Sequence, residues 1–187
     1  MSRARVHLAI ESVATMPRKQ TRRSQAPEDQ LRYLASPHGS LFYEALMMQE
    51  AAARCVEPTG KRSLQKDVPY NMAIECFLVH FRNLRDFLYP DDKVQAESDN
   101  VVAFDYDSNW AKTDKDWKDC SSDERRRINK LLAHISYSRR ELAHRWPIND
   151  MRQRIMQRLA AFIRCLPASR QEWFKNWDLE KAIGGMS

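Results

Sequence analysis

The sequence predicts an all-α fold, and three observations support this prediction. Only 4 of the 187 residues are glycine and 8 are proline, too few for the many tight turns of a β-sandwich or β-barrel. Between residues 69 and 89, apolar side chains recur at alternating steps of four and three, which is helical spacing. A serine followed three residues later by a glutamate, a helix-start signal, occurs at Ser121 and at Ser169. We expect a bundle of four to five helices around a central apolar helix at 69–89.

The first 36 residues differ in composition from the rest of the chain. They carry seven basic and three acidic side chains and few large apolar ones. Such a segment buries too little apolar surface to offset the entropy lost on ordering. We therefore predict a basic, disordered tail over residues 1–36 and one helical bundle domain over residues 37–187.

The first helix of the domain is predicted to begin at Ser40, a good N-cap residue, and to end before Pro58. Its inward positions are Leu41, Ala45, Met48, Ala52 and Cys55.

The second helix is predicted from Pro69 to Tyr89, and it is apolar around most of its circumference, as expected of the central helix. Its predicted inner stripe comprises Tyr70, Ile74, Phe77, Phe81, Leu84 and Leu88, widened by Met72, Cys76, Val79 and Phe87. Its predicted water-facing strip comprises Asn71, Glu75, Arg82, Arg85 and Asp86.

Residues 91–120 form an acidic segment, with nine acidic against four basic side chains and no sustained period. We predict an excursion laid over the bundle and pinned by its aromatic side chains, which are Phe104, Tyr106, Trp110 and Trp117. A loop of this length is either functional or contains a short helix. The run Asp105-x-Asp107-x-Asn109 resembles half of a calcium loop, but Trp110 occupies the position where the loop needs glycine, so no calcium site is expected.

Three further helices are predicted in the last third of the chain. One begins at Ser121 and ends before Pro147, and the next begins after Asn149 or Asp150. The inner stripe of that second one is Met151, Ile155, Leu159, Phe162 and Leu166. The last begins at Ser169 and carries two tryptophans, Trp173 and Trp177, one turn apart.

Cysteine spacing and hydropathy limit the class of protein. The four cysteines form no CxxC pair, which favours reduced thiols in a cytoplasmic protein. No apolar run approaches the roughly 20 residues of a membrane span. The chain has no glycine-rich phosphate loop and no recognisable metal-ligand spacing, so neither a cofactor nor a metal is expected.

The predicted helix that begins at Ser121 carries the densest basic pattern, within a segment, 121–187, that holds 14 basic and 7 acidic side chains. Basic side chains with an interleaved aromatic are typical of surfaces that bind phosphate backbones. The candidate binding residues are Arg126, Lys130, Tyr137 and Arg140. This pattern predicts a small interaction or regulatory module with a basic binding face, whose partner is RNA or another polyanion, a protein, or a second copy in a homodimer.

His80 and Asn83 lie on the central helix, away from its charged strip, so we expect them to be buried and to need partners. The predicted helix at Ser121 offers Asn129 and His134. Two interpretations remain open at this stage: a structural polar network between two core helices, or the wall of a substrate cleft.

A family resemblance adds a second functional class. Arg127 is followed after six residues by His134, and Arg139 is followed after four by His144. This Arg-x4–6-His pattern on a helix of a small bundle resembles the motif of HEPN domains, many of which are dimeric, metal-independent ribonucleases. The resemblance implies that Arg127 or Arg139 stabilises the scissile phosphate and that His134 or His144 moves a proton at the ribose 2′-OH. The polar residue that often follows the motif arginine is replaced by Ile128 after Arg127.

Overall fold

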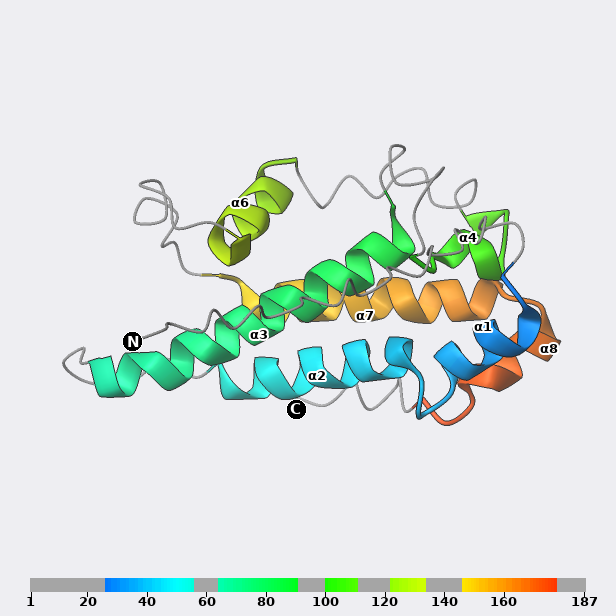
Figure 1. Ribbon diagram of the computed structural model, residues 1–187, viewed down its shortest axis with the longest axis horizontal. Helices are drawn as coiled ribbons and strands as arrows, with labels where there is room; N and C mark the ends of the chain where they lie inside the picture. Colours follow the sequence, from blue (N-terminus) through cyan, green and yellow to red (C-terminus); the bar gives the residue numbers. More distant parts are fainter. Residues whose placement is uncertain (1–25, 56–63, 91–99, 111–121, 134–145, 178–187) are drawn as a thin grey trace, which may run out of the picture.

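A computed structural model describes residues 26–55, 64–90, 100–110, 122–133 and 146–177 (Figure 1). These ranges contain helices and no β-strand, which confirms the all-α prediction for the described part of the chain. The elements are α1 (Glu28–Ala35), α2 (Ser40–Arg54), α3 (Leu64–Leu88), α4 (Ala103–Tyr106), α6 (Ser122–Ala133), α7 (Ile148–Cys165), α8 (Ala168–Gln171) and the 3₁₀ turn η4 (Glu172–Phe174).

Helix α3 is the centre of the bundle, as the sequence predicts. It packs against α2, α7 and α6, and in Figure 1 it runs between α6 and α2. Its inner stripe is buried from Ile74 to Leu88, including Phe77, Phe81 and Leu84. The helix begins at Leu64, so Pro69 lies inside it rather than in its first turn.

The predicted inner stripes of the two flanking helices are confirmed. On α2, Leu41, Ala45, Met48 and Ala52 are buried. On α7 and just after it, the five predicted inward residues from Met151 to Leu166 are all buried. The predicted start of α7 is wrong by two or three residues, because the helix begins at Ile148 after Pro147.

Helix α1 corrects the predicted boundary of the N-terminal tail. Residues 28–35, predicted to be disordered, form a helix that buries Leu31 and Ala35 in the core. Two of its backbone carbonyls accept hydrogen bonds from side chains far along the chain. Trp177 Nε1 donates to Ala35 O at 2.8 Å, and Tyr106 OH donates to Leu31 O at 2.9 Å. The predicted tail as far as residue 25 lies outside the described residues.

The turn between α1 and α2 depends on a glycine. A Cβ atom at Gly39 would collide with the backbone carbonyl groups of Tyr33 and Leu34. Only a residue without a side chain allows α2 to start this close to the end of α1.

The described part of the acidic segment, residues 100–110, is anchored by its aromatic side chains and contains the short helix α4. Tyr106 and Trp110 are buried, and both rings make edge contacts with Phe162 of α7. Trp110 Nε1 donates to Leu88 O at 2.9 Å, which closes the end of α3. Burial, followed by the charge of Asp105, raises the pKa of Tyr106. The rest of the predicted excursion, including Trp117, lies outside the described ranges.

Two predictions about the faces of α3 are wrong. Met72 and Val79, placed on the apolar face, are 64% and 39% exposed, because no described helix covers that side of α3. Arg85, placed on the water-facing strip, is only 3% exposed, and its guanidinium is paired with Asp86.

Within the described ranges, no helix has an apolar stretch long enough to cross a membrane. Cys55, Cys76 and Cys165 are free thiols.

Candidate functional site

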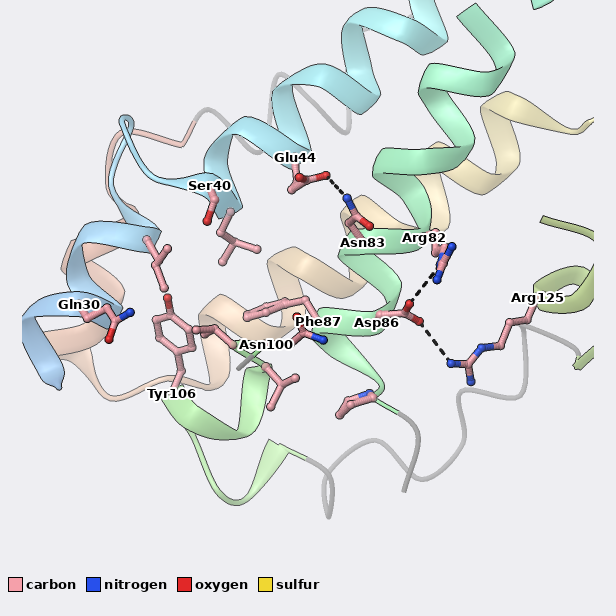
Figure 2. Close-up of a pocket in the computed structure, with 15 residues that line it drawn as sticks. Gln30, Ser40, Glu44, Arg82, Asn83, Asp86, Phe87, Asn100, Tyr106 and Arg125 are labelled. Atoms are coloured by element: carbon pink, nitrogen blue, oxygen red, sulfur yellow. Dashed lines mark hydrogen bonds and ion pairs between the residues drawn. The ribbon is translucent and has the colours of Figure 1, made fainter. Parts of the chain in front are cut away.

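A pocket of about 650 Å³ opens beside the second half of α3 (Figure 2). We call it the Glu44 pocket. It is bounded by α1, α2, α3, the segment leading into α4, and Arg125 of α6. Leu41, Phe87, Val101 and Val102 provide an apolar wall, and two groups of interacting polar side chains also line the pocket.

The first group is a cluster of three guanidinium groups around one carboxylate, which we call the arginine cluster. Asp86 Oδ1 lies 2.8 Å from Arg85 Nη2 and 3.7 Å from Arg125 Nη2. Asp86 Oδ2 lies 3.5 Å from Arg82 Nε. Figure 2 shows Arg82 and Arg125 approaching Asp86 from two sides.

The buried position of Arg125 and the charged side chains around it lower its pKa. Burial lowers the pKa of Arg125 most, the neighbouring guanidiniums of Arg85 and Arg82 lower it further, and Asp86 opposes them. The cation is therefore less favourable here than in water.

The second polar group lies at the other edge of the pocket and centres on Glu44 of α2. His80 Nδ1 donates to Glu44 Oε2 at 2.7 Å, and Asn83 Nδ2 donates to the same oxygen at 3.0 Å. His80 is 9% exposed and its ring meets the edge of Tyr43 at 5.7 Å between centroids. A carboxylate held by two donors in this way has a fixed orientation.

The predicted buried polar cluster is therefore not assembled as expected. Asn83 is exposed rather than buried, and the partner of His80 and Asn83 is Glu44 rather than a residue of α6. Asn129 of α6 stands apart, since its buried Oδ1 makes no hydrogen bond with the described part of the chain. The sequence held a signal for Glu44, which lies three residues after Leu41 and four before Met48, next to the inner stripe of α2.

The basic residues of α6 point in different directions. Arg126 is exposed and Lys130 is half-buried. Arg127 packs its guanidinium over the ring of Trp146 at 4.6 Å. Its Nε and Nη2 atoms are buried and make no hydrogen bond within the described residues.

The remaining predicted site residues, which are His134, Tyr137, Arg139, Arg140 and His144, lie in the range 134–145, outside the described residues. Among the residues that the structure does describe, no group of three or more His, Cys, Asp or Glu side chains is placed to hold a metal ion.

Comparisons with protein-family models, with curated proteins and with solved structures found no match for this chain. Its function therefore has to be inferred from the geometry of these sites.

Proposed function

We propose that this protein is a helical interaction module that binds single-stranded RNA through the outer side of α6 and the adjoining arginine cluster. The observation that carries the proposal is the gathering of three guanidinium groups around Asp86, which Arg82, Arg85 and Arg125 all approach. Arg126, exposed on the same helix as Arg125, extends this positive charge onto the surface.

Phosphate binding requires cationic side chains on one surface rather than a particular fold. Arg126 and Lys130 lie four residues apart on α6 and so project from the same face of the helix. Arg82 and Arg125 both lie within ion-pair distance of Asp86 and line the pocket beside α3. Guanidinium groups in such positions can each offer two parallel donors to a phosphate.

The experiment is a fluorescence anisotropy titration of a labelled single-stranded RNA at several salt concentrations. The double variant Arg126→Ala, Lys130→Ala should bind at least ~10-fold more weakly, because two phosphate contacts are lost. The slope of log affinity against log salt should fall by about 1.4, or about 0.7 per contact on a single strand.

Arg54→Ala is the control, because Arg54 is a 75% exposed side chain on α2 and the substitution removes one positive charge away from α6. It should bind RNA like the unmodified protein. Absence of RNA binding by the unmodified protein, or an equal loss in Arg54→Ala, would contradict the proposal.

Metal-independent ribonuclease activity is the alternative that the HEPN resemblance implies. The stacking of Arg127 on Trp146 favours binding over catalysis by the pair Arg127 and His134, because a catalytic arginine must reach the phosphate. The same RNA incubated in EDTA tests this alternative. Cleavage that is lost in both His134→Ala and His144→Ala would show that the protein is a ribonuclease rather than a binding module.

A further inference from the structure

We propose that Arg32 of α1 and Arg170 of α8, which both lie on the ring of Trp173, form a second site that binds phosphate groups of the RNA strand. We call these three residues the Trp173 site. This inference rests on the proposed function and deepens it, because it adds a contact surface far from α6. It is carried by two guanidinium groups that share one indole ring and have no acidic partner within the described residues.

The two guanidinium groups of the Trp173 site are held close together. Arg32 Cζ lies 5.6 Å and Arg170 Cζ lies 5.7 Å from the ring centre of Trp173. Since both distances end at the same ring, the separation of the two groups cannot exceed their sum. Cation–π attraction holds each arginine on the ring, while the two like charges repel each other.

Neither arginine is neutralised by a described acidic side chain. Arg32 is exposed, and its guanidinium makes no hydrogen bond or ion pair within the described residues. Arg170 is half-buried, and its single hydrogen bond in the same ranges is to a backbone carbonyl. Glu172, the acidic residue next to Trp173 in the chain, is paired with Lys175 instead. The site therefore differs from the arginine cluster, where Asp86 approaches all three guanidinium groups.

The hydrogen bond of Arg170 leaves one edge of its guanidinium group for a ligand. Nη1 donates to Tyr106 O, and Tyr106 is itself buried and bonded to Leu31 O. Nε and Nη2, the opposite edge, have no acceptor among the described residues. Two such donors on one edge can form parallel hydrogen bonds with a phosphate.

The indole of Trp173 also lacks an acceptor, because its buried Nε1 makes no hydrogen bond with the described part of the chain. The Trp173 site thus contains donors and no acidic acceptor. A phosphate group is anionic and accepts hydrogen bonds at several oxygens, which complements this combination. The indole ring is only 8% exposed, so we expect contacts with phosphate rather than stacking of bases on Trp173.

The Trp173 site is separate from α6. Glu124 of α6 pairs with Arg154 of α7 at 3.6 Å, whereas α8 begins at Ala168, after α7 ends at Cys165. Along α7, Arg154 and Cys165 are roughly 16 Å apart at the usual helical rise. Figure 1 shows α6 and α8 near opposite ends of α7. An RNA strand must therefore be several nucleotides long to contact both surfaces.

The experiment is an anisotropy titration with a labelled single-stranded RNA of about 20 nucleotides, longer than the roughly 4–16 nucleotides that one OB-fold domain covers. Arg32→Gln and Arg170→Gln should each lower the slope of log affinity against log salt by about 0.7. The double variant should lower it by about 1.4 and bind at least ~10-fold more weakly. Arg32→Lys keeps the charge and should retain the slope of the unmodified protein.

Two controls separate this site from general effects. Arg54→Gln removes a charge from a 75% exposed side chain on α2 and should leave RNA binding unchanged. Arg170→Gln also loses the bond to Tyr106 O, so circular dichroism melting measures its stability. Arg32→Gln should melt like the unmodified protein, which keeps the test valid if Arg170→Gln unfolds.

The proposal is overturned if both single variants bind the RNA with unchanged affinity and slope, or if Arg54→Gln loses as much. Calorimetric titration with inorganic phosphate is the second arm. Phosphate binding that Arg32→Gln removes, together with normal RNA binding by that variant, would assign the site to free phosphate and overturn the RNA contact. RNA binding that depends on Arg126 and Lys130 but not on Arg32 and Arg170 removes this site alone, whereas absence of RNA binding by the unmodified protein contradicts the proposed function itself.

Discussion

The two halves of α3 have similar apolar patterns and very different surroundings. In the first half, Val68 and Met72 are 48% and 64% exposed, whereas Phe77 and Leu84 in the second half are fully buried. Figure 1 shows the reason, since the first turns of α3 extend past the ends of α2 and α7. Periodicity predicts which side chains share a helix face, but only a neighbouring element decides whether that face is covered.

The difference extends to the charged residues. Arg85 and Asp86 lie in the covered half, and this half also supplies Arg82 and Asn83 to the Glu44 pocket. Packing around α3 removes water from Arg85, which is 3% exposed, and strengthens its interaction with Asp86, whereas Arg82 and Asn83 stay in contact with water.

The largest expected effect on stability is the difference between two charge substitutions, one in each half of α3. Phe81→Asp should unfold the domain, with a loss of about 4 kcal/mol or more in the free energy of unfolding, because it empties a core site and buries a carboxylate. Met72→Asp should change the free energy of unfolding by less than about 0.5 kcal/mol, because Met72 is exposed. Urea denaturation followed by circular dichroism measures both. A folded Phe81→Asp protein would show that the second half is not the core.

A smaller effect is expected from the paired arginines of the arginine cluster. Arg85→Met should lower the free energy of unfolding by about 1–3 kcal/mol, because its guanidinium is buried and hydrogen-bonded to Asp86. Arg82→Met should cost less than about 0.5 kcal/mol, because its side chain is 41% exposed and its ion pair is screened by water. The same urea titrations compare the two variants, and equal losses would mean that burial of Arg85 adds nothing.

The smallest effect is expected at Tyr106, which packs on Phe87 in the covered half of α3. Tyr106→Phe loses the hydrogen bond to Leu31 O and should cost about 1 kcal/mol. Because burial raises the pKa of Tyr106, the unfolded state releases this proton first, and stability should fall as the pH rises above the ordinary tyrosine value of about 10.

Tyr106→Phe should lack that alkaline contribution, whereas Tyr33→Phe, which alters a 59% exposed ring, should retain it. Urea titrations between neutral pH and pH above about 10 provide the measurement. An identical pH profile in the Tyr106→Phe and unmodified proteins would exclude Tyr106 as the titrating group.

The candidate site was only partly predictable. The positive charge of α6 and the polar character of His80 and Asn83 are visible in the sequence, since both depend on residue type and helical spacing. Two pairings could not be predicted from the sequence: Asp86 with Arg125 of α6, and His80 with Glu44 of α2. Each joins residues more than thirty positions apart in the chain. Nothing in a local pattern distinguishes Arg85, which is buried, from Arg82, which is not.

The sequence by itself determined the all-α class, the inner stripes of α2 and α7, and the role of α3 as the central helix. These follow from apolar periodicity, which is a property of a single helix. The tertiary structure alone decided that residues 28–35 join the core through Trp177 and Tyr106, and that Met72 stays exposed. The physical reason is that burial and ion pairing are properties of contacts between elements, and those contacts form only when distant segments of the chain meet.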